Sequence, residues 1–359
     1  MNKNCMILLG LLSLCITAKS QTEVQNIQPR DISEGIAYYL PKTALKISVT
    51  VTQTKYTPGD LASYASRYFK LSNVNQTPTT TWNLDNVAVE TYGIPDTSKF
   101  YIIPLKKGTS APLVGLTSDG IITSINVAES DNNEKMQEHN TEKKSSNKLN
   151  SKEYFTGEML EVNNKAKLAE LVATEIYDIR TSRNLLSRGE ADFMPKDGTQ
   201  LQIMIDQLNK QEQALTQLFK GSEETTTTTK YIYYVPENKV VKETFFRFSD
   251  ILGVVDNDNL AGEPVYIDVC PLNNSQVSSQ TTLSPSQLKK LQQSGVRYNI
   301  PCPTSIKIYS SDNILLNNKV SIAQFGFIEY LSADLFNKRE DTHILFDSVT
   351  GGIKKIYNE

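Results

Sequence analysis

Two glutamates and two arginines stand at positions where charged side chains are not expected. At 100° per residue, Glu175 and Arg183 fall inside the apolar stripe of one predicted helix, and Glu212 falls inside that of the next. Counted from the connection between the helices at about 1.5 Å per residue, the two glutamates lie at nearly the same level. Arg183 lies about one or two turns nearer the connection than the glutamates, and Arg180 lies between Glu175 and Arg183. These charges are therefore expected to point inward from the two helices.

Two kinds of chemistry would account for inward charges. Buried charges are usually paired, so Arg180 and Arg183 would neutralise one or both carboxylates in a structural network. Alternatively, Glu175 and Glu212 would form a carboxylate pair in which one pKa is raised, as general acid–base catalysis requires. The spacing of the residues does not choose between these interpretations.

The two helices that carry these charges are the most regular part of the sequence. Apolar residues recur every three or four positions over 168–179, and a second apolar face begins after Thr199 and ends at Gly221. The connection over 188–198 is short, so the helices are expected to fold back on each other. We predict an antiparallel helical hairpin over 153–221.

Other residues that could support catalysis or bind a metal are few. His139 lies in a polar stretch, and His343 lies in a strand pattern where a histidine is usually structural. The sequence contains no Gly-x-Ser-x-Gly, His-Glu-x-x-His or CxxC motif and no phosphate-binding loop. We therefore expect no metal site and no cofactor. A glycan hydrolase that uses Glu175 and Glu212 remains an alternative, because two catalytic carboxylates leave no local signature.

The first twenty residues have the pattern of a secretory signal peptide. Lys3 precedes an apolar run over 6–16, and small residues stand before Gln21. We predict cleavage after Ser20 and an exported protein, either periplasmic or associated with the cell envelope. No later run approaches the about 18 apolar residues of a membrane span, so no transmembrane segment is expected in the mature chain.

Two cysteines remain after this cleavage, Cys270 and Cys302. In an oxidising compartment such a pair favours a disulfide, which would stabilise the fold by roughly 3–4 kcal/mol in the chain-entropy model. The alternative is two buried thiols. The sequence predicts the disulfide.

Strand patterns on both sides of the helices indicate an α+β fold. Residues 45–52 alternate apolar and polar side chains, and similar patterns return after the helices. We expect an N-terminal α+β domain over 21–127, a flexible polar linker over 128–152 and a C-terminal β-rich domain over 222–359. Two mainly antiparallel β-rich units would thus flank the helical hairpin.

The two strand-rich ends share short patterns. Residues 40–47, with Leu-Pro before a strand, are matched by 300–308, with Ile-Pro before a strand. The hairpin pattern over 116–121 is matched over 346–353. A duplicated β unit and common strand composition both explain these matches.

Several of these segments resemble a known family. The helical block contains Ile179-Arg180 through Arg183 and Leu186, the Asp197-Gly198 turn, Gln211-Glu212 and Leu218-Phe219. Further matches are Leu40-Pro41-Lys42-Thr43, Pro58-Gly59, Phe246-Arg247-Phe248-Ser249, Gly262-Glu263-Pro264-Val265 and Ala323-Gln324-Phe325-Gly326. Together they resemble a secreted family of Bacteroides-type bacteria that is catalogued as a domain of unknown function. The resemblance covers most of the mature chain except 128–152, and it implies export but no activity, ligand or catalytic residue.

The composition narrows the range of partners. Loss of Lys3 and Lys19 with the signal peptide leaves 35 basic against 40 acidic side chains, a net charge of −5. This balance argues against a nucleic-acid partner. The leading interpretation is an exported, non-catalytic binding or envelope-associated module whose partner is an envelope protein or a glycan.

Overall fold

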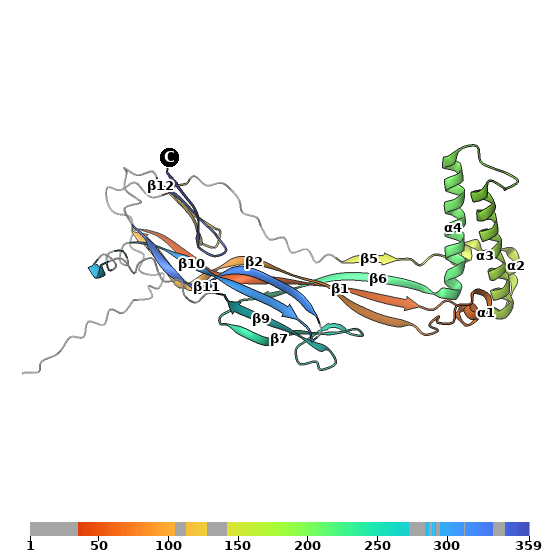
Figure 1. Ribbon diagram of the computed structural model, residues 1–359, viewed down its shortest axis with the longest axis horizontal. Helices are drawn as coiled ribbons and strands as arrows, with labels where there is room; N and C mark the ends of the chain where they lie inside the picture. The colour runs from red at the N-terminus through yellow and green to blue at the C-terminus, as the bar shows by residue number, and fades with distance from the viewer. Residues whose placement is uncertain are drawn as a thin grey trace, which may run out of the picture.

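The computed structural model describes residues 35–104, 113–127, 142–272, 284–286, 289, 291, 295–311, 313–332 and 342–358. They form an elongated molecule that is mostly antiparallel β-sheet, with two long helices at one end (Figure 1). No helix among them is both long and apolar enough to cross a membrane. The predicted signal peptide, residues 1–20, and His139 lie outside the described residues.

The first sheet is built on β1, whose sequence alternates apolar and polar residues. Its strands lie in the order β2-β1-β6-β5, with the bounds Thr79–Pro104, Gly35–Thr57, Ser222–Tyr234 and Lys143–Ser146. Leu45, Ile47 and Val49 are fully buried on one face, whereas Ser48 and Thr50 on the other are only half-buried. This period of two follows because successive side chains of a strand point to opposite faces.

Two further antiparallel sheets complete the β-structure. The second has the order β11-β10-β9-β7-β8, with the bounds Ile314–Leu331, Val296–Tyr309, Glu263–Pro271, Val240–Ser249 and Gly253–Val255. The third has the order β13-β12-β4-β3, with the bounds Ile353–Asn358, Thr342–Phe346, Ile122–Ile125 and Val114–Leu116. The apolar face of β1 packs on the second sheet, where Ile47 shares one core with Ile267 and Ile306.

The helices form a separate cluster at the end of β1 and β2. Their bounds are Ala65–Phe69 for α1, Gly157–Glu161 for α2, Lys165–Arg188 for α3 and Gly198–Lys220 for α4, with 3₁₀ helices at Ala62–Tyr64 and Ser151–Tyr154. Asn164 caps α3, because its Oδ1 accepts a hydrogen bond from Ala166 N at 2.8 Å. Helices α3 and α4 lie side by side and share a core that includes Ile176 and Leu215 (Figure 1).

Strands from the two β-rich regions share sheets instead of forming separate units on either side of the helices. Strand β1 pairs with β6 over thirteen positions, starting with Leu45 opposite Tyr234. Strand β4 pairs with β12, where Ile125 lies opposite Ile344. A one-sided apolar pattern shows that a strand has a buried face but not which strand lies beside it. The helices therefore lie between the two β-rich regions in the sequence, but at one end of the molecule in the structure.

The predicted flexible linker, 128–152, is described only in its second half. Residues 128–141 lie outside the described part of the chain. Residues 143–146 form the edge strand β5, which pairs with β6, and a 3₁₀ helix begins at Ser151. All four residues of β5 are exposed, so a strand at this edge needs no apolar residues. Its polar composition therefore gave no strand signal.

The predicted disulfide between Cys270 and Cys302 is absent, and that prediction is wrong. Cys270 of β9 lies opposite Ser305 of β10. Ser305 is three residues along β10 from Cys302. At about 3.3 Å per residue this offset is about 10 Å, beyond the about 7 Å between Cα atoms that a disulfide spans. The spacing of the two cysteines in the sequence does not show how β9 and β10 are aligned.

The sequence repeat corresponds to a repeated arrangement of strands. Strand β1 pairs with β2 and strand β10 with β11, and each pairing has an irregularity beside a proline, at Pro41 and at Pro301. The short hairpins that follow meet in the third sheet, where β4 pairs with β12. Equivalent hydrogen bonds tie each hairpin turn to its long strand, from Tyr39 N to Gly120 O at 2.8 Å and from Asn299 N to Gly351 O at 3.0 Å. The two ends of the chain therefore share the same local arrangement of strands and turns.

Candidate functional site

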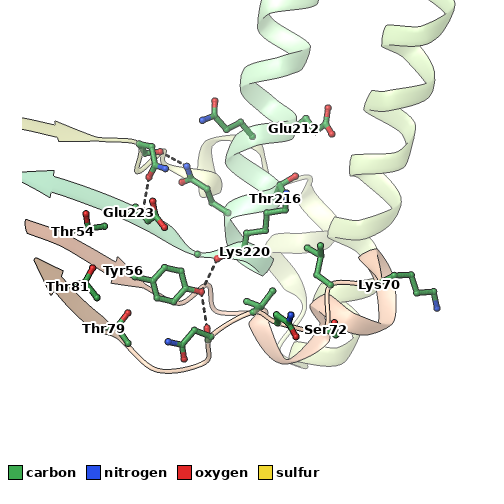
Figure 2. A pocket seen from close by; sticks show the side chains of 18 of the residues that line it. Thr54, Tyr56, Lys70, Ser72, Thr79, Thr81, Glu212, Thr216, Lys220 and Glu223 are labelled. Atoms are coloured by element: carbon green, nitrogen blue, oxygen red, sulfur yellow. Dashed lines mark hydrogen bonds between the residues drawn. The ribbon is translucent and has the colours of Figure 1, made fainter. Parts of the chain in front are cut away.

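An open cleft of about 1020 Å³ lies where helix α4 meets the ends of β1, β2 and β6 (Figure 2). Its wall is completed by the connection over 70–75, which follows α1, and by Arg180 of α3. The volume is at the upper end of the range typical of small-molecule sites, about 300–1,000 Å³. Segments distant in sequence therefore form one concave surface.

The floor of the cleft is fixed by contacts between the end of β1 and the last turn of α4. The Tyr56 hydroxyl lies 2.9 Å from the carbonyl oxygens of Asn75 and Lys220 (Figure 2). Leu61 N donates a hydrogen bond to Leu218 O at 2.8 Å. A Cβ atom added to Gly59 would stand 2.1 Å from Leu218 O, so glycine permits this close approach. The cleft thus has a well-defined base before any ligand binds.

Amide side chains fix one wall. Gln217 of α4 accepts a hydrogen bond from Leu149 N at 2.9 Å, and its Nε2 donates to Asn147 O. Asn147 in turn accepts a hydrogen bond through Oδ1 from Glu223 N at 2.9 Å. These bonds join α4, the segment after β5 and the start of β6. The side of the cleft opposite the 70–75 connection is therefore held in place.

The structure places Arg180, Arg183 and Glu212 together. Arg180 Nε donates to Glu212 Oε1 at 2.6 Å, and Arg183 Nη1 donates to Glu212 Oε2. Arg183 also donates to Asn209 Oδ1 at 2.8 Å, and the Arg180 guanidinium lies over the Phe69 and Tyr177 rings. The Glu212 side chain is 15% exposed, so the two hydrogen bonds form in a partly desolvated setting.

These contacts determine the charge state of Glu212. Partial burial disfavours the ionised carboxylate, but hydrogen bonds and charges from Arg180 and Arg183 outweigh it and lower the pKa of Glu212 below its ordinary value of 4.5. Glu212 is therefore ionised at neutral pH. A general acid needs a raised pKa, and this carboxyl group has the opposite shift.

The other predicted candidates do not join this site. Glu175 is half-buried on α3 and forms no ion pair with another described residue, and it does not line the cleft. His343 lies in β12, where its Nδ1 contacts Asn126 O and its ring stacks on Tyr357 with 5.0 Å between centroids. Within the described ranges, no group of three or more His, Cys, Asp or Glu could hold a metal ion. Of the two predicted carboxylates, only Glu212 lines the cleft.

The lining of the cleft is mostly neutral and polar. Twelve of its twenty residues carry an amide or hydroxyl group, three are basic and two are acidic. Thr216 of α4 is unusual among them, because its buried Oγ1 has no hydrogen-bond partner among the described atoms (Figure 2). An unsatisfied buried hydroxyl costs about 1–3 kcal/mol. The surface is equipped to make many hydrogen bonds without a strong net charge.

Most of these residues could not be found from the sequence. The helical period identified Glu212 because the signal is local to one helix. Thr54, Asn73 and Thr81 are ordinary strand and loop residues, and only long-range strand pairing brings them near α4. The one sequence signal close to the floor was Pro58-Gly59, part of the family resemblance.

Comparison with known proteins places the chain in a family. A family model described as "Domain of unknown function (DUF4831)" matches residues 34–354, which confirms the predicted membership of a domain family of unknown function. No curated protein and no solved structure gives a significant match. Because the match covers the helices, nearly all of the three sheets and every residue that lines the cleft, the chain belongs to the DUF4831 family.

Proposed function

We propose that this protein is an exported, non-catalytic binding module and that the cleft beside α4 is its ligand site. The observation that carries the proposal is an open, polar concavity of about 1020 Å³ with a floor and wall already fixed by hydrogen bonds. A preformed surface lowers the entropy cost of ligand binding. The apolar run over 6–16 supports export, and the partner is an envelope component.

The charges at the cleft favour binding over acid–base catalysis. Glu212 is held ionised by Arg180 and Arg183, and Glu175 does not line the cleft. A glycan hydrolase of the usual kind needs two carboxyl groups about 5–9 Å apart across one bond, one of them protonated. The network instead fixes α3 against α4 at the rim of the cleft. This arrangement serves to shape a binding surface.

Export gives the first expected result. The native protein, isolated from the cell that makes it, should begin at Gln21 and lie in the periplasmic or envelope fraction. Intact mass and N-terminal sequencing of that material measure the cleavage site. A native chain that retains Met1 in the cytoplasmic fraction would contradict export.

A variant that fills the cleft tests the binding site. Gln213 is exposed on α4 and lines the cleft, and no described hydrogen bond depends on it, so Gln213→Trp should block entry without removing a structural contact. Gln207→Trp is the matched control, because Gln207 is exposed on the same helix and does not line the cleft. Each protein is immobilised and exposed to solubilised envelope material. We expect wild type and Gln207→Trp to retain a component of this material and Gln213→Trp not to retain it.

The same variants, together with Glu212→Gln, distinguish binding at the cleft from the two other possibilities, binding elsewhere and hydrolysis. Equal retention by wild type and Gln213→Trp would show that the cleft is not the binding site. Turnover of an oligosaccharide panel by wild type, abolished by Glu212→Gln in a folded variant, would instead establish the hydrolase that uses Glu175 and Glu212. The retained material is assayed for protein and for hexose, so that a protein ligand is distinguished from a carbohydrate ligand.

A further inference from the structure

We infer that the cleft beside α4 recognises a neutral carbohydrate, and that the ligand extends from the cleft along the threonine-rich face of the first sheet. This inference rests on the proposed binding function and names the class of ligand. It is carried by the lining of the cleft, by the orientation of the neighbouring strand residues and by the unsatisfied hydroxyl of Thr216.

The lining matches a ligand that is rich in hydroxyl groups. Side chains with amides both donate and accept hydrogen bonds, as hydroxyl groups do, and these two kinds make up twelve of the twenty lining residues. The charged residues are nearly balanced, and the carboxylate of Glu212 is already occupied by two arginines. A strongly charged ligand would find no unmatched cluster of opposite charge there. Tyr56, Asn147 and Gln217 are already bonded within the protein, and the other amide and hydroxyl groups of the lining offer partners to a neutral polyol.

Beyond the cleft, the same sheet face carries a row of threonines. Thr54 lines the cleft, and a period of two places Thr52 and Thr50 on the same face of β1. Their hydroxyl groups pair across to β6, between Thr52 and Thr227 at 2.8 Å and between Thr50 and Thr229 at 3.0 Å, and Thr52 also donates to Asp85 Oδ2 at 2.5 Å. A linear chain of sugar units leaving the cleft would therefore continue over hydroxyl groups. This predicts that affinity rises with chain length.

Thr216 provides the sharpest test. Its Oγ1 has no partner among the described atoms although it borders a polar cleft. A threonine in a helix has two accessible χ1 rotamers, so this hydroxyl can change direction when a ligand binds. A hydroxyl that is unsatisfied in the free protein and satisfied in the complex contributes to affinity. It makes no comparable contribution to the stability of the free protein.

The experiment is calorimetric titration of the full mature chain with glucose, mannose, galactose and N-acetylglucosamine and with linear trisaccharides of each. The expected result is that at least one trisaccharide binds, and binds more tightly than its monosaccharide. Thr216→Val should weaken that binding about five- to tenfold, the value of one hydrogen bond, while the melting temperature stays equal or rises. Thr174→Val is the matched control, because Thr174 is exposed on α3 and bonds Glu170 O at 3.0 Å.

Several outcomes would overturn the inference. If no sugar produces heat, or if Thr216→Val binds as tightly as wild type, the cleft does not recognise a carbohydrate in this way. If envelope protein without hexose is retained by wild type and lost by Gln213→Trp, the ligand class is wrong while the binding function stands. If Thr216→Val lowers the melting temperature, the hydroxyl has a structural role instead.

Discussion

Phe219→Ala is expected to lower the free energy of unfolding by about 3–5 kcal/mol, the range for truncating a fully buried phenylalanine. Phe219 is 0% exposed, and its ring makes edge contacts with Phe69 at 4.8 Å and Tyr68 at 6.4 Å between centroids. It lies on the last turn of α4, so it joins α4 to α1 and to the helical core. Chemical denaturation followed by circular dichroism measures the loss.

The location of Phe219 adds a functional expectation. Because the cleft floor is formed by the same turn of α4, a variant that remains folded should also lose ligand binding. Phe193→Ala is the control, since Phe193 is 76% exposed in the α3–α4 connection and its removal should change the free energy of unfolding by less than about 0.5 kcal/mol. Equal effects of the two substitutions would show that the helices are not anchored through Phe219.

Glu212→Gln is expected to lower the free energy of unfolding by about 2 kcal/mol at pH 7. Hydrogen bonds to charged groups contribute about 1.5–3 kcal/mol, and partial exposure of both arginines keeps the effect below the about 3–5 kcal/mol of a fully buried pair. Glu175→Gln is the matched control, because Glu175 forms no ion pair with any residue that the structure describes. The control should change stability by less than about 0.5 kcal/mol.

The effect of Glu212→Gln should depend on pH in one direction. Arg180 and Arg183 lower the folded-state pKa of Glu212, so its ionised form stabilises the folded protein at every pH above the unfolded pKa of about 4.5. As the pH falls through the lower folded-state pKa, the carboxylate is protonated and this stabilisation is lost. The difference between wild type and Glu212→Gln should therefore shrink below about pH 4.5. A difference that grows on acidification would contradict the lowered pKa.

Local patterns predicted the elements well. The period of 3.6 placed α3 and α4 within a few residues of their ends, and the period of two identified the buried face of β1. Each of these signals depends only on neighbours in the sequence. The inward charges of the helices were found for the same reason, because a charge inside an apolar stripe is visible without knowing the fold.

Pairings between distant segments could not be predicted in the same way. Nothing in β1 specifies β6 as its neighbour, and nothing near Cys270 shows that it lies opposite Ser305. Strand register is set by the packing of whole sheets, so the disulfide and the two separate β-rich units were reasonable expectations from local composition alone. The cleft was invisible for the same reason, since its walls come from segments that meet only in the folded chain.

The position of β6 beyond the helices has a consequence for the order in which the first sheet forms. Strand β1 ends at Thr57, but its partner β6 begins at Ser222, about 165 residues later. Contacts between segments far apart in sequence cost loop-closure entropy, so this pairing is expected to form later than the β1–β2 pairing. Until β6 pairs, one edge of β1 stays open, and open edges promote aggregation.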